Sequence, residues 1–426
     1  MRFALVNPNW KFERSIYFGC REPHLPLEFG YSKTLLEKNG HDAEMIDGQM
    51  ENLRTSEIRT RIATICPDFT VITTAPSYLF WRCAPPELTV PKRLISQIRD
   101  VAAAIVAVGP HASTTPRAAL RKLEADVVVL GECEEILPRL ASGSPPVSTC
   151  YRDGDSIRVE NSPHSTDMAT LPALAWPDQT IRAHTHHHHR FDAFTGPGAE
   201  METSRGCPYH CTFCAKDNFR NRYRRRPLST ILTELDGLLN QGVRYIYFID
   251  EIFLPNRELL LALAERSRAA NLKIGVQTRI DLWNFETIDL LADAGCVSIE
   301  AGVESLTPEG RDLLDKKCRL ETHELSERLM YAKRRIAFVQ ANLIMTGLDD
   351  PKMVREWRDR MRAAGVWAND PVPLFPYPGS PDYTLRWGAP DDFAWERAHQ
   401  HYLASFHQFS DIQESRPAPL AELEGS

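Results

Sequence analysis

The sequence lacks a hydrophobic run long enough to cross a membrane. Of its 426 residues, 43% are hydrophobic, but no apolar stretch approaches the roughly 20 residues that a membrane-spanning helix needs. The N-terminal run Met1–Val6 passes directly into a strand-like pattern, without the long apolar core and small-residue cleavage site of a secretory signal. We therefore expect no membrane partner and no signal peptide.

The sequence also lacks an excess of positive charge and a regular cysteine framework. The formal net charge is −7, which argues against a general nucleic-acid-binding protein. The ten cysteines do not pair at the spacings of a disulfide scaffold, so we expect a reducing, cytoplasmic location. No short solenoid repeat is present, and the length suits two domains.

Three cysteines stand close together in the middle of the chain. Cys207, Cys211 and Cys214 have the spacing C-x3-C-x2-C. Three thiolates can hold three irons of a cubic [4Fe–4S] cluster and leave the fourth iron open, whereas a fourth cysteine ligand would close the cluster for electron transfer. A structural zinc site is the alternative, with His210 as a fourth ligand, but zinc ligands often come as two spaced pairs and no second pair follows. The spacing therefore favours an iron–sulfur cluster.

Residues 1–142 alternate short apolar runs with helical patterns. The predicted strands are residues 3–6, 43–46, 69–73, 104–108 and 126–130. Strands that alternate with helices indicate a doubly wound, Rossmann-like parallel sheet in an α/β fold. Ligands of such sheets bind at the carboxyl ends of the strands.

A second alternating region covers residues 199–385. Its predicted strands are residues 245–249, 273–277, 297–300 and 337–344. The predicted helices between them are residues 259–269, 285–294 and 323–333. Repeated strand–helix units of this length predict a full or partial α/β barrel.

The alternation is lost in residues 143–198 and in residues 386–426. The first stretch contains several prolines and is predicted to be a linker, and the second is a tail with aromatic and histidine residues. The linker carries His184 and the run His186–His189, which could bind a metal ion, a substrate or a neighbouring domain. Adjacent histidines rarely all face one ion, so the last two interpretations are favoured over metal binding.

The cysteine motif, with Phe213 before its last cysteine, closely resembles the signature of the radical S-adenosylmethionine (SAM) enzymes. The resemblance implies a [4Fe–4S] cluster held by Cys207, Cys211 and Cys214, and a partial (β/α)6 TIM-type barrel. It also implies that the methionine end of SAM chelates the open iron and that reduction cleaves SAM to a 5′-deoxyadenosyl radical. An external electron donor of the flavodoxin or ferredoxin type is then expected.

The same resemblance implies SAM-binding residues at the strand ends. Asp250 and Glu251 match the segment that contacts the SAM amino group, and Gln277 and Arg279 match a strand end that often meets the carboxylate or ribose. The remaining expected contacts are Phe213, Glu304 and Ser305. A lone carboxylate at any of these places could instead cap a strand.

The first 142 residues resemble the cobalamin-binding domain that precedes the barrel in one radical SAM class. The resemblance lies in residues 108–113 and 129–135, where small residues follow a strand and allow close backbone approach. The cobalamin contacts that it implies are Thr73, Thr74, Tyr78, Trp81, Gly109, Pro110, His111, Gly131 and Glu132. The D-x-H-x-x-G motif is absent, so no histidine ligand for cobalt is evident, and such a sheet could also hold a nucleotide or no ligand.

Together these features predict a cobalamin-dependent radical SAM methyltransferase of the class B type. It would transfer a methyl group from methylcobalamin to an unactivated carbon of a small molecule, of the natural-product or saccharide type, after hydrogen abstraction by the 5′-deoxyadenosyl radical. The alternatives are a cyclase, rearrangement or oxidation enzyme with the same cofactors and, more distantly, a cobalamin- or metal-sensing protein. A monomer is expected, and no catalytic residue is assigned.

Overall fold

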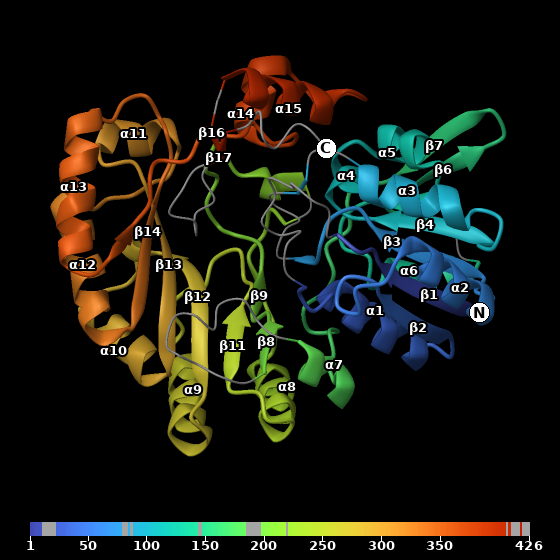
Figure 1. The fold of residues 1–426 in the computed structure, drawn as a ribbon, viewed down its shortest axis with the longest axis horizontal. Helices are drawn as coiled ribbons and strands as arrows, with labels where there is room; N and C mark the ends of the chain where they lie inside the picture. Colours follow the sequence, from blue (N-terminus) through green and yellow to red (C-terminus); the bar gives the residue numbers. More distant parts are fainter. Residues whose placement is uncertain are drawn as a thin grey trace. The chain divides into compact units, whose positions relative to one another are not determined.

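The computed structural model describes residues 1–10, 23–78, 84–85, 88–143, 147–184, 197–218, 220–405, 408–409 and 418–419. The chain divides into two compact units (Figure 1). Unit 1 comprises Met1–Thr180, Cys214–Asn221 and Pro376–His401, and unit 2 comprises Ile181–Phe213, Arg222–Phe375 and Tyr402–Ser426.

Unit 1 is built on a seven-stranded sheet with the order β2-β1-β3-β4-β5-β6-β7. Its parallel strands are β1 (Arg2–Asn7), β2 (Asp42–Asp47), β3 (Phe69–Thr73), β4 (Ala104–Val108) and β5 (Val127–Val129). The antiparallel strands β6 (Thr149–Asp153) and β7 (Ser156–Glu160) extend the edge at β5 and come from the predicted linker. The order 2-1-3-4-5 is the flavodoxin-like doubly wound order, and it confirms the predicted fold class of this part.

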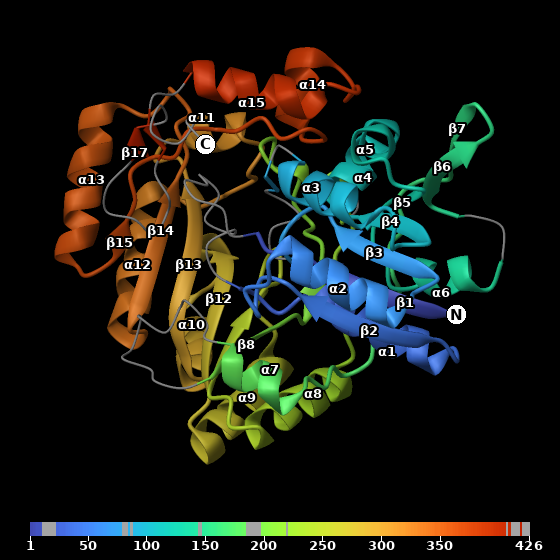
Figure 2. The same ribbon diagram turned by 45° about the vertical axis from the view of Figure 1, so that its right-hand side comes forward.

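Helices cover the sheet of unit 1 because their apolar residues recur at helical spacing. The helices are α1 (Leu27–Lys38), α2 (Thr55–Ile65), α3 (Thr89–Ile98), α4 (Pro110–Thr114), α5 (Pro116–Leu123) and α6 (Ile136–Ala141). In α2, Ile58, Ile62 and Ile65 lie on one face and pack in a core cluster with Ile72 and Ile105 of the sheet. Figure 2 shows α2 beside the sheet of unit 1.

Unit 2 contains a six-stranded parallel sheet whose order, from β8 to β15, follows the chain. Its strands are β8 (Gly198–Met201), β11 (Tyr245–Phe248), β12 (Lys273–Arg279), β13 (Cys296–Glu304), β14 (Phe338–Leu343) and β15 (Trp367–Ala368). This succession of parallel strands with connecting helices confirms the predicted (β/α)6-type arrangement.

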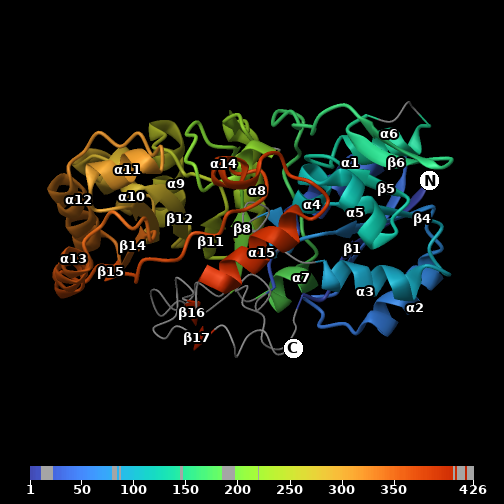
Figure 3. The same cartoon turned by 90° about the horizontal axis from the view of Figure 1, so that it is seen from above.

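The helices of unit 2 begin at recognisable capping residues. They are α8 (Leu228–Asn240), α9 (Arg257–Ala270), α10 (Phe285–Asp293), α11 (Pro308–Leu313), α12 (Thr322–Arg335) and α13 (Pro351–Ala363). The side chains of Asn256, Asn284 and Asp350 accept hydrogen bonds from backbone N–H groups in the first turns of α9, α10 and α13. Figure 3 shows α12 and α13 at the same end of unit 2 as β14 and β15, which they contact.

The strand period of two decides which residues of β12 face the helices. Ile274 and Val276 are buried, and Thr278 donates its hydroxyl to the carbonyl of Phe253. Gln277 and Arg279 point to the opposite face. Gln277 and Arg279, the two residues of β12 that were predicted to contact SAM, therefore share one side of this strand.

Two helices lie in and just before the C-terminal tail. They are α14 (Pro381–Trp387) and α15 (Ala394–Ser405). Lys122 donates to the carbonyl of Asp392 at 2.7 Å and pairs with Glu396, and the ring of Trp395 lies 4.2 Å from that of His111. None of the described helices is both long and apolar enough to span a bilayer.

Gly131→Ala should destabilise unit 1. Gly131 has φ +83°, and an added Cβ would lie 2.2 Å from the carbonyl oxygen of His164. We expect a loss of about 2–4 kcal/mol, from backbone strain and overpacking together. Urea unfolding followed by circular dichroism measures it. Gly154→Ala is the control, because Gly154 also has positive φ (+57°) but no atom within 4 Å of its Cβ position. Equal losses in both variants would contradict the prediction.

Candidate functional site

The cysteine motif lies in an irregular loop that follows β8. Between β8 and the first cysteine, the short strand β9 (Ser204–Arg205) pairs with β10 (Arg224–Arg225) in antiparallel fashion. The thiols of Cys207, Cys211 and Cys214 are all half-buried. The backbone N–H of Thr212 donates to the carbonyl of Leu314 at 3.0 Å. The motif is therefore presented by a loop whose ends are fixed by sheet and backbone contacts.

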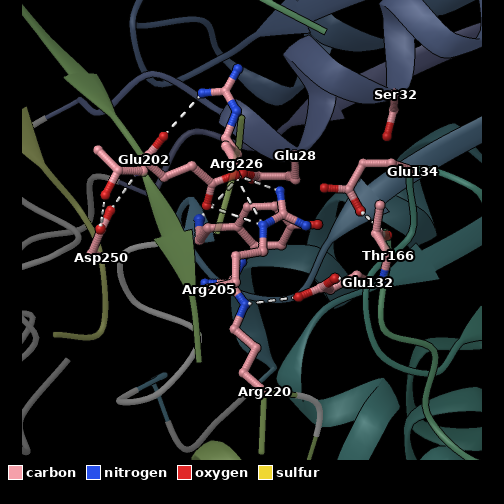
Figure 4. Close-up of polar contacts among 12 residues, drawn as sticks. Glu28, Ser32, Glu132, Glu134, Thr166, Glu202, Arg205, Arg220, Arg226 and Asp250 are labelled. Carbon is pink, nitrogen blue, oxygen red and sulfur yellow. Dashed lines mark hydrogen bonds and ion pairs between the residues drawn. The ribbon is translucent and has the colours of Figure 1, made fainter. Parts of the chain in front are cut away.

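Asp250, two residues after the end of β11, holds the backbone that leads to this loop. It is 1% exposed and accepts hydrogen bonds from the backbone N–H of Thr203 (2.7 Å), the hydroxyl of Thr203 and the hydroxyl of Ser204 (2.7 Å). Burial raises the pKa of Asp250 from 3.8 to about 7, although these hydrogen bonds lower it. Figure 4 shows Asp250 among the buried polar residues.

Glu251 contacts the backbone two residues further along the chain than Asp250 does. Its Oε2 atom accepts a hydrogen bond from the backbone N–H of Gly206 at 2.8 Å, next to Cys207. Both carboxylates that were predicted to meet the SAM amino group thus contact the segment Thr203–Gly206.

Two buried ion pairs fix the β9–β10 ribbon. Arg205 donates to Glu202 from Nε at 3.0 Å and from Nη2 at 2.6 Å. Arg226 pairs with Glu234 of α8 at 2.7 Å. It also donates to the carbonyl of Glu202 at 3.0 Å, and both of these residues are labelled in Figure 4. Within the basic run 224–226, Arg226 is thus buried and has a structural role. Sequence reasoning missed Glu202 and Glu234, because neither stands in a recognisable motif.

Gln277 and Arg279 occupy the end of β12. The amide Nε2 of Gln277 donates to Glu300 at 3.2 Å. Arg279 donates to Asp281 from Nε at 3.1 Å and from Nη2 at 2.7 Å, and its guanidinium lies 3.9 Å from the ring centroid of Tyr209. Because Tyr209 stands between Cys207 and Cys211, the structure brings Arg279 to the cysteine loop.

Glu304 and Ser305 lie at the end of β13 with partners that the sequence did not indicate. Glu304 has φ +71° and pairs with Lys316 at 3.1 Å, and Lys316 also donates to the carbonyl of Gly302 at 2.9 Å. The hydroxyl of Ser305 donates to Asp349 at 2.8 Å. Phe213 is half-buried in the cysteine loop.

In unit 1, the end of β3 carries two buried hydroxyl groups. Thr73 and Thr74 are 0% exposed, and neither Oγ1 atom has a hydrogen-bond partner among the described residues. Gly109 has φ +137°, and a Cβ there would lie 2.2 Å from the Oγ1 of Thr74. Pro110 begins α4, and His111 is buried, which lowers its pKa to about 3. The predicted residues of β3 and β4 are therefore brought together.

Three other residues predicted to contact cobalamin, Tyr78, Gly131 and Glu132, lie against other residues of unit 1. The backbone N–H of Tyr78 donates to Glu28, whose pKa is raised to about 8 by burial. The guanidinium of Arg220 lies 4.3 Å from the ring centroid of Tyr78. It is also 3.3 Å from Glu132, as Figure 4 shows. Gly131 makes room for the backbone of His164, and Trp81 lies outside the described residues.

The histidine-rich segment is described only at His184. Its Nε2 atom is 2.8 Å from Glu200 of β8, and both side chains are buried. His186–His189 lie outside the described residues.

Within the described part of the chain, no three His, Cys, Asp or Glu side chains come together closely enough to hold a single metal ion. A cubane distributes its thiolate ligands over different irons, so its ligands are spaced more widely than those of one ion.

Residues 201–356 match the Radical SAM superfamily. The chain contains a radical SAM domain. This family match confirms the predicted family and, with it, the expected use of SAM and a [4Fe–4S] cluster.

Among curated proteins, the chain is similar to one named "Uncharacterized methyltransferase PH0819" from Pyrococcus horikoshii. The two are 26% identical over 328 residues, which cover 74% of this chain and 68% of the relative. It is also similar to the anaerobic magnesium-protoporphyrin IX monomethyl ester cyclase of Cereibacter sphaeroides, with 25% identity over 87% of this chain and 60% of the cyclase. The chain thus spans about two thirds of the length of these relatives.

Among solved structures, the fold is similar to that of the radical SAM methyltransferase TsrM from Kitasatospora setae, whose structure contains cobalamin and a [4Fe–4S] cluster. The TM-score is 0.68 at 21% identity, with 89% of this chain and 76% of TsrM covered. At this identity the likeness establishes the fold, and it agrees with a doubly wound domain followed by a radical SAM domain.

Asp250→Asn should change the pH dependence of stability. Asp250 binds its proton more tightly in the folded than in the unfolded chain, because its pKa is raised from 3.8 to about 7. Its contribution to the free energy of unfolding is therefore fully present below the lower value and is lost as the pH rises through about 7. We expect the decrease in stability between these values to be smaller in the variant, as measured by urea unfolding at a series of pH values.

The control for this measurement is Asp100→Asn. Asp100 is exposed, and its hydrogen bond with Arg59 lowers its pKa to about 2, so it does not titrate in that range. A wild-type pH profile for Asp250→Asn would show that the pKa of Asp250 is not raised in the folded protein.

Proposed function

We propose that this protein is a cobalamin-dependent radical SAM methyltransferase that methylates a carbon atom of a small-molecule substrate. The carrying observation is the C-x3-C-x2-C loop in the radical SAM domain, held in place by Asp250 and Glu251. The doubly wound sheet that precedes it has the strand order expected for a ligand-binding domain.

Cys207, Cys211 and Cys214 would hold three irons of a [4Fe–4S] cluster. The cluster, when bound, supplies the electron that cleaves SAM to the radical that abstracts hydrogen from the substrate. The chain's own contribution is to orient the thiols: Asp250 and Glu251 satisfy the backbone N–H groups of Thr203 and Gly206, which the irregular loop leaves without sheet partners. A flavodoxin- or ferredoxin-type donor would provide the electron.

SAM would lie at the carboxyl ends of β11, β12 and β13. Among the residues there, we assign direct contacts to Phe213, Glu251, Gln277, Glu304 and Ser305. The oxygen atoms of Asp250 already accept several protein hydrogen bonds, so this residue acts through the backbone that it holds. Arg279 is engaged by Asp281 and Tyr209, and it faces the cysteine loop.

Unit 1 would bind cobalamin at the ends of β3 and β4. The buried hydroxyls of Thr73 and Thr74 fit this assignment, because burying a hydroxyl without a hydrogen bond is costly and a bound ligand would satisfy it. Gly109 and His111 follow β4 beside them, and the similar fold of TsrM binds cobalamin. Cobalamin would supply the methyl group that is transferred.

A second candidate function keeps these cofactors and forms or rearranges a ring. It is supported by the similarity to the magnesium-protoporphyrin ester cyclase. SAM carrying a deuterated methyl group separates the two functions, because only a methyltransferase places that label in its product.

Cys211→Ala should abolish cluster assembly and SAM cleavage, because two thiolates cannot hold the cubane in this loop. After anaerobic reconstitution with iron and sulfide, we expect loss of the iron–sulfur EPR signal and of 5′-deoxyadenosine formation, with cobalamin uptake retained. Cys66→Ala, which alters an exposed cysteine of unit 1, should behave like the wild type. Stoichiometric zinc without sulfide in the wild-type protein would overturn the proposal.

Thr74→Val should weaken cobalamin binding without loss of stability. The Oγ1 atom of Thr74 has no partner among the described residues, so replacing it with a methyl group removes no protein hydrogen bond. We expect about a five- to tenfold weaker affinity for hydroxocobalamin, corresponding to one hydrogen bond of about 1–1.5 kcal/mol, in equilibrium dialysis. Thr149→Val is the control, because Thr149 is an equally buried threonine on β6 with an unpartnered hydroxyl. Unchanged affinity in Thr74→Val would remove Thr74 from the cobalamin site.

A further inference from the structure

Arg279 is held in a fixed orientation by two contacts on different sides. Asp281 accepts hydrogen bonds from its Nε and Nη2 atoms, and the face of the Tyr209 ring lies 3.9 Å from the guanidinium carbon. A bidentate carboxylate together with an aromatic face leaves the guanidinium little freedom to rotate. Arg279 is therefore a preorganised positive charge at the end of β12.

The third nitrogen of this guanidinium has no protein partner. Arg279 is 6% exposed, and its Nη1 atom is buried without a hydrogen bond to any of the described residues. A buried donor that stays unpaired is costly, and an anionic acceptor that binds to the protein would satisfy it. The orphaned nitrogen indicates that such an acceptor belongs beside Arg279.

Arg279 lies against the cysteine loop. Tyr209, which Arg279 contacts, is two residues from Cys207 and two residues from Cys211. The stacked Tyr209 ring therefore places the Arg279 guanidinium against the loop that carries the expected cluster ligands.

We propose that Arg279 is a positioning residue that holds the cysteine loop through Tyr209 and makes the cluster easier to reduce. A fixed positive charge stabilises the reduced cluster, which carries one more negative charge, relative to the oxidised cluster. Asp281 orients Arg279 and partly offsets its charge. The inference rests on the [4Fe–4S] cluster of the proposed function.

The test compares two substitutions that should have opposite effects. Each protein is reconstituted anaerobically and equilibrated with a viologen mediator at one potential, and EPR spectroscopy gives the ratio of reduced to oxidised cluster. In Arg279→Gln we expect this ratio to fall about tenfold, which corresponds to ~59 mV for a one-electron couple. In Asp281→Asn we expect the ratio to rise, because a negative charge is removed while Arg279 keeps its charge.

Arg266→Gln is the matched control. Arg266 of α9 makes the same two-bond contact with a carboxylate, from Nε and Nη2 to Asp236 at 2.7 Å each, but on the helical layer of unit 2. We expect the wild-type ratio in this variant. A tenfold fall in Arg266→Gln would show that the effect is not specific to the cluster loop.

The outcomes separate an electrostatic role from a structural one. Opposite changes in the two variants support the inference, whereas equal falls in both would show that the contact only maintains loop structure and would overturn it. A wild-type ratio in Arg279→Gln would also overturn it. If Arg279→Gln assembles no cluster, Asp281→Asn decides: a rise supports the inference, and no change or a fall refutes it. Cluster assembly and SAM cleavage by the wild-type protein test the proposed function separately.

Discussion

The burial of charged side chains around an irregular loop is the constraint on which the site depends. A loop that presents three cysteines cannot continue the ladder of β8, so the backbone N–H groups before it need other acceptors. Asp250 and Glu251 supply them from the neighbouring strand, at Thr203 and Gly206. The ion pair of Arg205 with Glu202 lies in the same segment and is fully buried. Removing one partner of such a pair would leave an uncompensated charge in the interior.

Two polar residues at the strand ends make contacts that differ from those implied by the family resemblance. Asp250 and Arg279 stand where family resemblance expects ligand contacts, yet their hydrogen bonds run to Thr203, Ser204 and Asp281. A polar residue at a strand end can therefore shape the ligand site by holding the loop that forms it. In unit 1 the hydroxyls of Thr73 and Thr74 show the opposite situation, since they are buried without protein partners and suit a ligand.

Much of the fold was predictable because the spacing of apolar residues in long segments indicates whether they form a strand or a helix. β3 was predicted at its observed bounds, and β12 and α12 were predicted within two residues at each end. The two-residue strand β15 and the edge strands β6 and β7 were missed, because they are too short or too weakly apolar to show a period. The region that contains β6 and β7 was predicted to be a linker because of its prolines. Proline is nevertheless tolerated in strands at the edge of a sheet.

The sequence by itself determined the alternation of strands and helices, the three-cysteine motif and the order of the polar strand ends, because each of these is a local pattern. Only the tertiary structure decided which polar groups meet. The pairing of Arg279 with Tyr209, of Lys316 with Glu304 and of Asp250 with Thr203 joins positions from 12 to 70 residues apart, separations that follow from their residue numbers. Such contacts depend on how strands and loops pack, and no period or spacing along the chain encodes them.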